Sequence, residues 1–146
     1  MGAWGTDPFD NDTAADFAAD VREASDVQAR QDLLLATMRA PAEKITTFTL
    51  TPGYEFGYEL EMGIAAAAFV ADAHTGTHEF TDNSYARGVA DDEALSLLPY
   101  AELGQMTPDL LEAARGLCRA ALGLMERDRV EEEWHVPVRT LLERLA

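Results

Sequence analysis

The stretch Ile64-Ala-Ala-Ala-Ala-Phe-Val70 is the part of this sequence that decides the expected fold. It lies within a longer segment, residues 55–73, whose composition is typical of a helix, and its small side chains would let neighbouring helices approach closely. The longest apolar run, Met62 to Ala71, is too short to cross a bilayer. We therefore expect residues 55–73 to form the central helix of a domain that does not associate with membranes.

Two helices are expected before this segment. Residues 12–24 carry apolar side chains at the spacing of one buried helical face. Three good N-cap residues open this helix: Asp10, Asn11 and Asp12. Ser25 and Gln28 form a capping box that starts the second helix, and Pro41 is expected to end it. The two helices would form a hairpin.

Two further helices are expected near the C-terminus. Thr107 as N-cap and Pro108 at the first helical position predict a long helix with a clear apolar face. Asp128 and Glu131 form a second capping box, and Pro137 is expected to interrupt or restart the last helix.

The connecting segments are harder to assign. Residues 45–51 are rich in β-branched side chains and alternate between apolar and polar ones, as a strand does. No second strand is available to pair with them, so we expect an extended connector. Residues 74–92 resemble one long loop, and a short helix is expected over 92–98. With no repeat or linker in the sequence, we predict a single domain over 1–146: mainly α, a compact bundle of about five to six helices.

The chain opens with an aromatic, glycine-rich segment in which Trp4 and Phe9 are expected to pin the terminus against the core. Gly5 would let the backbone lie close to the helices. This N-terminal motif therefore has two parts, an anchor for the terminus and the start of a helix. Its residues are Trp4, Gly5, Phe9, Asp10, Asn11 and Asp12.

The first seventeen residues fit the pattern Met-Gly-x-Trp-Gly-Thr-x-x-Phe-Asp-Asn-Asp-x-Ala-x-Asp-Phe. This pattern resembles the start of the bacterial family called domain of unknown function 4259, although Asp7 replaces the usual glycine. Three later features are also similar to that family: the alanine-rich segment 63–71, Thr107-Pro-Asp109 and Glu133-Trp134. The resemblance implies a small helical fold and supplies no catalytic residues.

The chain is strongly acidic, with 27 acidic and 11 basic residues and a formal net charge of −16. Residues 1–100 carry 18 acidic and 5 basic side chains, a net of −13. Nucleic acid is therefore a disfavoured partner, whereas a basic protein would be attracted. The single cysteine, Cys118, lies on an apolar helix face, and no secretion signal opens the chain, so we expect a cytoplasmic bacterial protein.

Asp12, Asp16 and Asp20 follow one another at helical spacing, with Glu23 beside them. Such an acidic stripe is an ordinary solvated face, a docking face for a basic partner or a divalent cation site. The three interpretations remain open at this point.

A second polar cluster combines His74, His78 and Glu79 with Asp72. On a continuous helix both imidazoles would lie on one side, as a zinc or iron site requires. Further ligands would come from the preceding helix or from His135. The alternative is an ordinary polar loop, because Gly76 and two threonines weaken the helix between the histidines.

No sequence motif for nucleophilic catalysis, phosphate binding or dinucleotide binding is present. The sequence does not decide whether the protein is an enzyme. It favours a non-enzymatic protein that needs no cofactor. We expect an acidic interaction module that binds a basic partner, as an inhibitor or immunity protein does. The alternatives are a metal-dependent enzyme or metal-binding protein that uses His74 and His78, and a structural domain that forms homo-oligomers.

Overall fold

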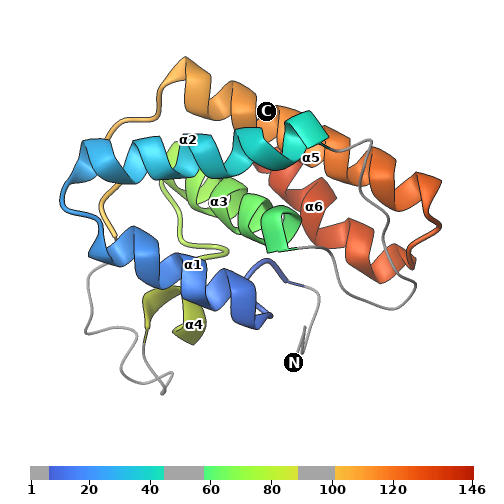
Figure 1. Cartoon of the computed structure of the whole chain (residues 1–146), viewed down its shortest axis with the longest axis horizontal. Coiled ribbons are helices and arrows are strands. Elements are labelled where there is room, and N and C mark those ends of the chain that lie inside the picture. The colour runs from blue at the N-terminus through green and yellow to red at the C-terminus, as the bar shows by residue number, and fades with distance from the viewer. Residues whose placement is uncertain (1–6, 45–57, 89–100) are drawn as a thin grey trace.

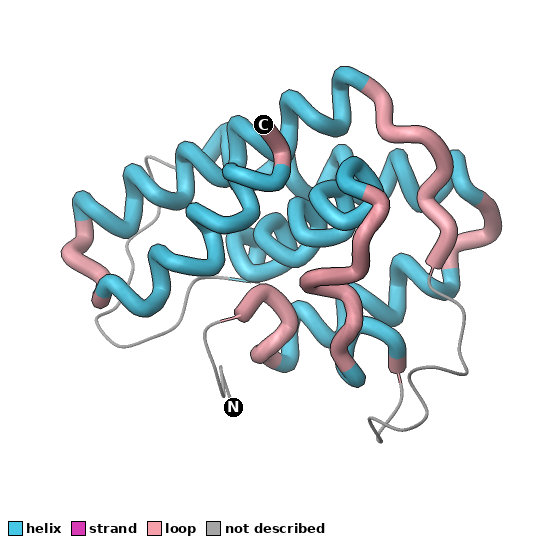
Figure 2. The backbone as a smooth tube through the Cα atoms, turned by 180° about the vertical axis from the view of Figure 1, so that it is seen from behind, coloured by secondary structure: helices cyan, strands magenta, loops and turns pink. Residues whose placement is uncertain are grey.

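The structure is a computed structural model that describes residues 7–44, 58–88 and 101–146. Trp4, Gly5, the 45–51 connector and the 92–98 helix of the sequence analysis lie outside these residues. The described part is mainly helical, as predicted (Figures 1 and 2). It contains six helices: α1 (Asp12–Glu23), α2 (Val27–Lys44), α3 (Tyr58–Thr75), α4 (Ser84–Arg87), α5 (Pro108–Arg127) and α6 (Glu132–Arg144).

Helix α3 is the centre of the bundle, as the alanine-rich stretch predicts. It contacts α1, α2, α5 and α6, which surround it in Figure 1. The side chains from Ala65 to Ala68 are fully buried. A helix that is apolar around its whole circumference has no solvated face to present, so burial on all sides is the stable solution.

Helix α1 begins and ends within one residue of the prediction. The Asn11 side chain caps it by accepting a hydrogen bond from the backbone N–H of Ala14 at 2.7 Å. Its apolar face is buried against the core: Ala14, Phe17, Ala18 and Val21.

The predicted start of α2 is wrong. Asp26, and not Ser25, caps the helix, because its carboxylate accepts a hydrogen bond from the backbone N–H of Ala29 at 2.8 Å. The Gln28 side chain donates instead to Asp32, one turn further on. The capping box predicted from Ser25 and Gln28 therefore does not form.

The predicted end of α2 is also wrong, since Pro41 lies inside the helix. Pro41 is buried, and it approaches α3 so closely that a Cβ atom on Gly63 would lie 3.1 Å from its Cγ. This packing offsets the backbone hydrogen bond that proline cannot donate.

Helix α5 starts as predicted, with Pro108 in the first turn and the Thr107 hydroxyl accepting from the N–H of Leu110 at 3.2 Å. The capping box of Asp128 and Glu131 is wrong. Asp128 ends α5 and accepts from Arg127 at 2.8 Å, while the Glu131 side chain forms no capping bond.

Helix α6 neither stops nor restarts at Pro137, which is buried within it. Its apolar face packs into the core as expected, with Val138, Leu141 and Leu145 buried. No helix in the described ranges is both apolar enough and long enough to cross a membrane.

Candidate functional site

The first candidate is the acidic face of α1, formed by four exposed carboxylates: Asp12, Asp16, Asp20 and Glu23. They lie opposite the buried face of the same helix. Among the residues that the structure describes, none forms an ion pair or a side-chain hydrogen bond with these four groups. The acidic face therefore presents its negative charge to solvent.

Arg22 is the one basic residue of α1, and its guanidinium does not lie among the four carboxylates of the acidic face. Arg22 donates from its guanidinium to the carbonyl oxygen of Ala86 in α4, at 2.7 Å. A Cβ atom on Gly88 would lie only 2.6 Å from the Arg22 guanidinium. Arg22 thus ties α1 to α4.

Several arginines of the C-terminal part pair with carboxylates near them. Arg144 on α6 forms a two-bond fork with Glu79, at 2.7 and 3.2 Å. Arg139 pairs with Glu132 about two turns earlier on the same helix, and the hydrogen bond lowers the pKa of that carboxyl. These pairs neutralise charge locally and leave the acidic face of α1 without a described counterion.

Among the described residues, the structure does not bring three or more of the predicted metal ligands to one point. Helix α3 ends at Thr75, and Gly76 takes a positive φ of 71°, so His74 and His78 do not share a continuous helix. Glu79 is held by Arg144. Within the described ranges, no group of three or more histidine, cysteine, aspartate or glutamate side chains is placed to hold a metal ion.

His135, the other imidazole considered as a ligand, is buried on α6. Its Nδ1 lies 3.1 Å from the carbonyl oxygen of Glu131 in the preceding turn. Cys118 is likewise buried, and burial raises the pKa of its thiol to about 12. Both side chains belong to the core.

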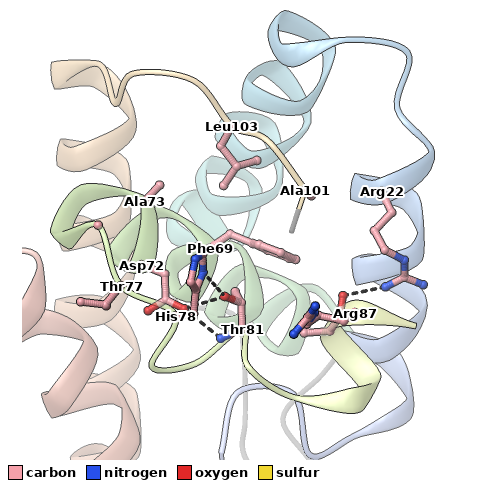
Figure 3. Close-up of a pocket in the computed structure, with 12 residues that line it drawn as sticks. Arg22, Phe69, Asp72, Ala73, Thr77, His78, Thr81, Arg87, Ala101 and Leu103 are labelled. Carbon is pink, nitrogen blue, oxygen red and sulfur yellow. Dashed lines mark hydrogen bonds between the residues drawn. The ribbon is translucent and has the colours of Figure 1, made fainter. Parts of the chain in front are cut away.

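The second candidate was missed by sequence reasoning. A cavity of about 180 Å³ lies where the end of α3 and its following loop meet α1, α4 and residues 101–103 (Figure 3). Asp72, a member of the polar cluster predicted around His74 and His78, lines this cavity and is 4% exposed. No local sequence signal marks the cavity, because Arg22, Ala101 and Leu103 reach it from segments distant from Asp72 in sequence.

Asp72 holds the loop that follows α3. Its Oδ2 accepts hydrogen bonds from the N–H of Phe80 at 3.0 Å, and from the N–H and hydroxyl of Thr81, both at 2.8 Å. Burial nevertheless raises the pKa of this carboxyl, because desolvation outweighs the hydrogen bonds. The loop predicted over 74–92 is thus interrupted: it is fixed at Asp72 and contains the short helix α4.

The N-terminal segment joins the core through Phe9, which is 1% exposed. The Phe9 ring meets Phe69 of α3 edge to face, with ring centroids 5.2 Å apart. The anchoring expected of this aromatic residue is therefore present, while Trp4 lies outside the described residues.

These features define a class: a mainly helical domain built around a buried alanine-rich helix, with an N-terminal segment packed on that helix through Phe9. The chain belongs to the family described as domain of unknown function (DUF4259), which matches residues 2–135. No curated protein and no solved structure matches it.

Proposed function

We propose that this protein is a non-enzymatic interaction module that docks a basic protein surface against the acidic face of α1. One observation carries the proposal: four carboxylates of α1 are exposed, and none of them pairs with a cation in the described part of the chain. They are Asp12, Asp16, Asp20 and Glu23.

The energetics support a partner. Like charges one helical turn apart destabilise a helix by about 0.2–0.5 kcal/mol per pair. Only Asp12 lies in the first turn, where the helix dipole favours an anion. A partner that places lysine or arginine side chains between these carboxylates would relieve the repulsion and gain from the net charge of −16.

A divalent cation fits the acidic face less well. Calcium requires six to eight oxygen ligands at about 2.3–2.6 Å from one point. Carboxylates spread along a single helix have Cβ atoms about 5–6 Å apart and point outward, so they do not converge on one ion. The face suits several separate cationic side chains better.

The partner class that we propose is a basic enzyme or toxin, for which this chain acts as an inhibitor or immunity protein. A bacterial cytoplasm is the compartment that we propose for the interaction. The single cysteine, buried and without a disulfide, supports a reducing compartment.

The test compares two variants with the same net charge. The face variant neutralises the four α1 carboxylates: Asp12→Asn, Asp16→Asn, Asp20→Asn and Glu23→Gln. The control variant neutralises four exposed carboxylates on α5 and α6: Asp109→Asn, Glu112→Gln, Glu126→Gln and Glu133→Gln. Each removes four negative charges from −16 and leaves −12.

Each protein is immobilised and exposed to lysate at low and at high salt, and the captured proteins are identified. We expect a basic protein to be captured at low salt by the wild type and the control variant, but not by the face variant. Capture should weaken at high salt, because the Debye length falls to about 3 Å at 1 M. Equal capture by the face and control variants, or no capture by the wild type, would contradict the proposal.

A further inference from the structure

A hollow of about 340 Å³ lies where three segments of the chain meet. Its walls come from the turn over residues 7–9, the loop over 79–83 and the middle of α6 over 136–140. Its volume lies at the lower end of the roughly 300–1,000 Å³ of ligand pockets. It shares no residue with the cavity beside Asp72 or with the acidic face of α1, so it is a separate site.

The hollow has an apolar surface that solvent reaches. Val136 lines it and is 51% exposed, and within the described ranges no other large apolar side chain is exposed to that degree. Phe80 also lines it, half-buried and packed against the core, and Pro8 and Pro137 add further apolar surface. These groups suit the aliphatic stem of a long side chain.

The charged side chains that line the hollow are all carboxylates: Asp7, Glu79 and Asp82. Two of them already bind arginines of this chain, since Arg144 forks onto Glu79 and Arg87 pairs with Asp82 at 3.4 Å. Asp7 differs from both, because it is exposed and its carboxylate pairs with no cation in the described part of the chain. The hollow therefore contains one negative charge without a described counterion.

Asp7 also lies close to a second carboxylate, that of Asp10. The backbone N–H of Asp7 donates to Oδ2 of Asp10 at 3.3 Å, and the N–H of Asp10 donates to the carbonyl oxygen of Asp7 at 3.0 Å. Burial is the main cause that raises the pKa of Asp10, and repulsion from the Asp7 carboxylate raises it further. A cation bound beside Asp7 would relieve this repulsion.

An arginine side chain matches these features best. Its methylene stem covers apolar surface such as Val136, its N–H fork fits a carboxylate such as Asp7, and its planar head stacks on an aromatic ring such as Phe80. A lysine ammonium is a strongly hydrated point charge that forms neither the fork nor the stack. A metal ion would leave the apolar surface uncovered.

We propose that this hollow receives one arginine side chain presented by a partner protein. The guanidinium binds the carboxylate of Asp7 and stacks on Phe80, and the stem covers Val136. The proposal goes beyond the docking of basic proteins on α1 and does not depend on it, so either can fail without the other.

The test titrates the whole ¹⁵N-labelled chain at low salt with three blocked amino acids: N-acetyl-arginine methylamide and its citrulline and lysine analogues. Citrulline keeps the length and shape of arginine but carries a neutral urea group, and lysine keeps the charge without the planar fork. We expect the arginine probe to shift the amide resonances of Phe80, Val136 and Thr140 saturably. The citrulline probe should bind about tenfold more weakly and the lysine probe about threefold more weakly.

The variant Asp7→Asn isolates the carboxylate. The hydrogen bonds that join Asp7 to Asp10 use only backbone atoms of Asp7, so the variant can keep them. Its affinity for the arginine probe should fall about tenfold. The control Asp109→Asn removes an exposed carboxylate at the start of α5 and should bind as the wild type does. The face variant leaves the hollow unchanged and should also bind the probe.

The proposal is overturned if the arginine probe does not bind saturably up to about 10 mM, or if the citrulline or lysine probe binds as tightly. It is also overturned if folded Asp7→Asn keeps wild-type affinity or if the face variant loses the binding. Self-association of the wild type that Asp7→Asn abolishes would place a second copy of this chain in the hollow, against the proposal. The comparison of probes uses the wild-type protein, so it decides the matter even if Asp7→Asn fails to fold.

Discussion

Replacing Gly63 by alanine tests how closely the helices pack around α3. A Cβ atom at this position would lie 2.8 Å from Cδ2 of Leu117 on α5 and 3.1 Å from Cγ of Pro41 on α2. Carbon atoms prefer separations of about 3.5–4.0 Å, so α5 or its leucine must shift by about 0.7 Å. Leu117 is fully buried and Pro41 is rigid and buried, so neither yields easily.

Overpacking of this kind costs about 1–3 kcal/mol, while alanine gains about 1 kcal/mol over glycine in helix propensity. The net expectation for Gly63→Ala is a loss of about 1 kcal/mol in the free energy of unfolding. Gly123 on α5 is the matched control, because it is exposed and a Cβ atom there meets no atom within 4 Å. Gly123→Ala should therefore stabilise the protein by up to about 1 kcal/mol.

Urea unfolding followed by circular dichroism measures both changes, and the two variants should differ by about 2 kcal/mol. A difference of that size corresponds to roughly 4–8 °C in Tm for a domain near 150 residues. If Gly63→Ala stabilises the protein as much as Gly123→Ala does, the close packing of α2, α3 and α5 at Gly63 is refuted.

Three further predictions concern single side chains. Asn11→Ala removes the cap of α1 and should cost about 1 kcal/mol, measured by urea unfolding; an unchanged midpoint would argue against the cap. Burial raises the pKa of Asp72, so its contribution to stability is greatest below about pH 4 and declines as the pH rises through the folded-state pKa. Asp72→Asn cannot ionise at this position, so its stability relative to the wild type should rise as the pH increases from about 4 to 7, and thermal melts in which that relative stability falls would contradict the raised pKa. Because burial raises the pKa of Cys118 to about 12, a thiol reagent at pH 8 should label it only at the rate of unfolding, whereas rapid labelling of the native protein would contradict its burial.

Short sequence patterns predicted the helices well where a residue type strongly prefers one position in a helix or one environment. Thr107 followed by Pro108 fixed the start of α5, because the hydroxyl caps the helix and proline loses no hydrogen bond there. The alanine-rich stretch of α3 was assigned to the centre for an equally simple reason, since it has no polar face.

Predictions failed where several residues compete for one role. Ser25 and Asp26 are both good caps, and in the structure the Asp26 carboxylate is the group that accepts from the N–H of Ala29. The internal prolines of α2 and α6 show the same limit, because tertiary packing compensates for the lost backbone hydrogen bond.

The acidic face could be predicted from sequence because it lies on one helix and depends only on helical spacing. The cavity could not, because Arg22, Asp72 and Leu103 come from three separate segments that only the fold brings together. For the histidine cluster the sequence leaves a metal site and a polar loop open, and the end of α3 at Thr75, before Gly76, fits the polar loop.

The most direct test of the central claim is a map of where a basic ligand contacts this protein. An octa-arginine peptide is titrated into the ¹⁵N-labelled chain at low salt, and changes in the amide resonances are followed. We predict that the largest changes fall on the residues of α1, from Asp12 to Glu23, and disappear in the face variant while persisting in the control variant. Changes spread evenly over the acidic residues of the whole chain, or retained in the face variant, would contradict a docking face on α1.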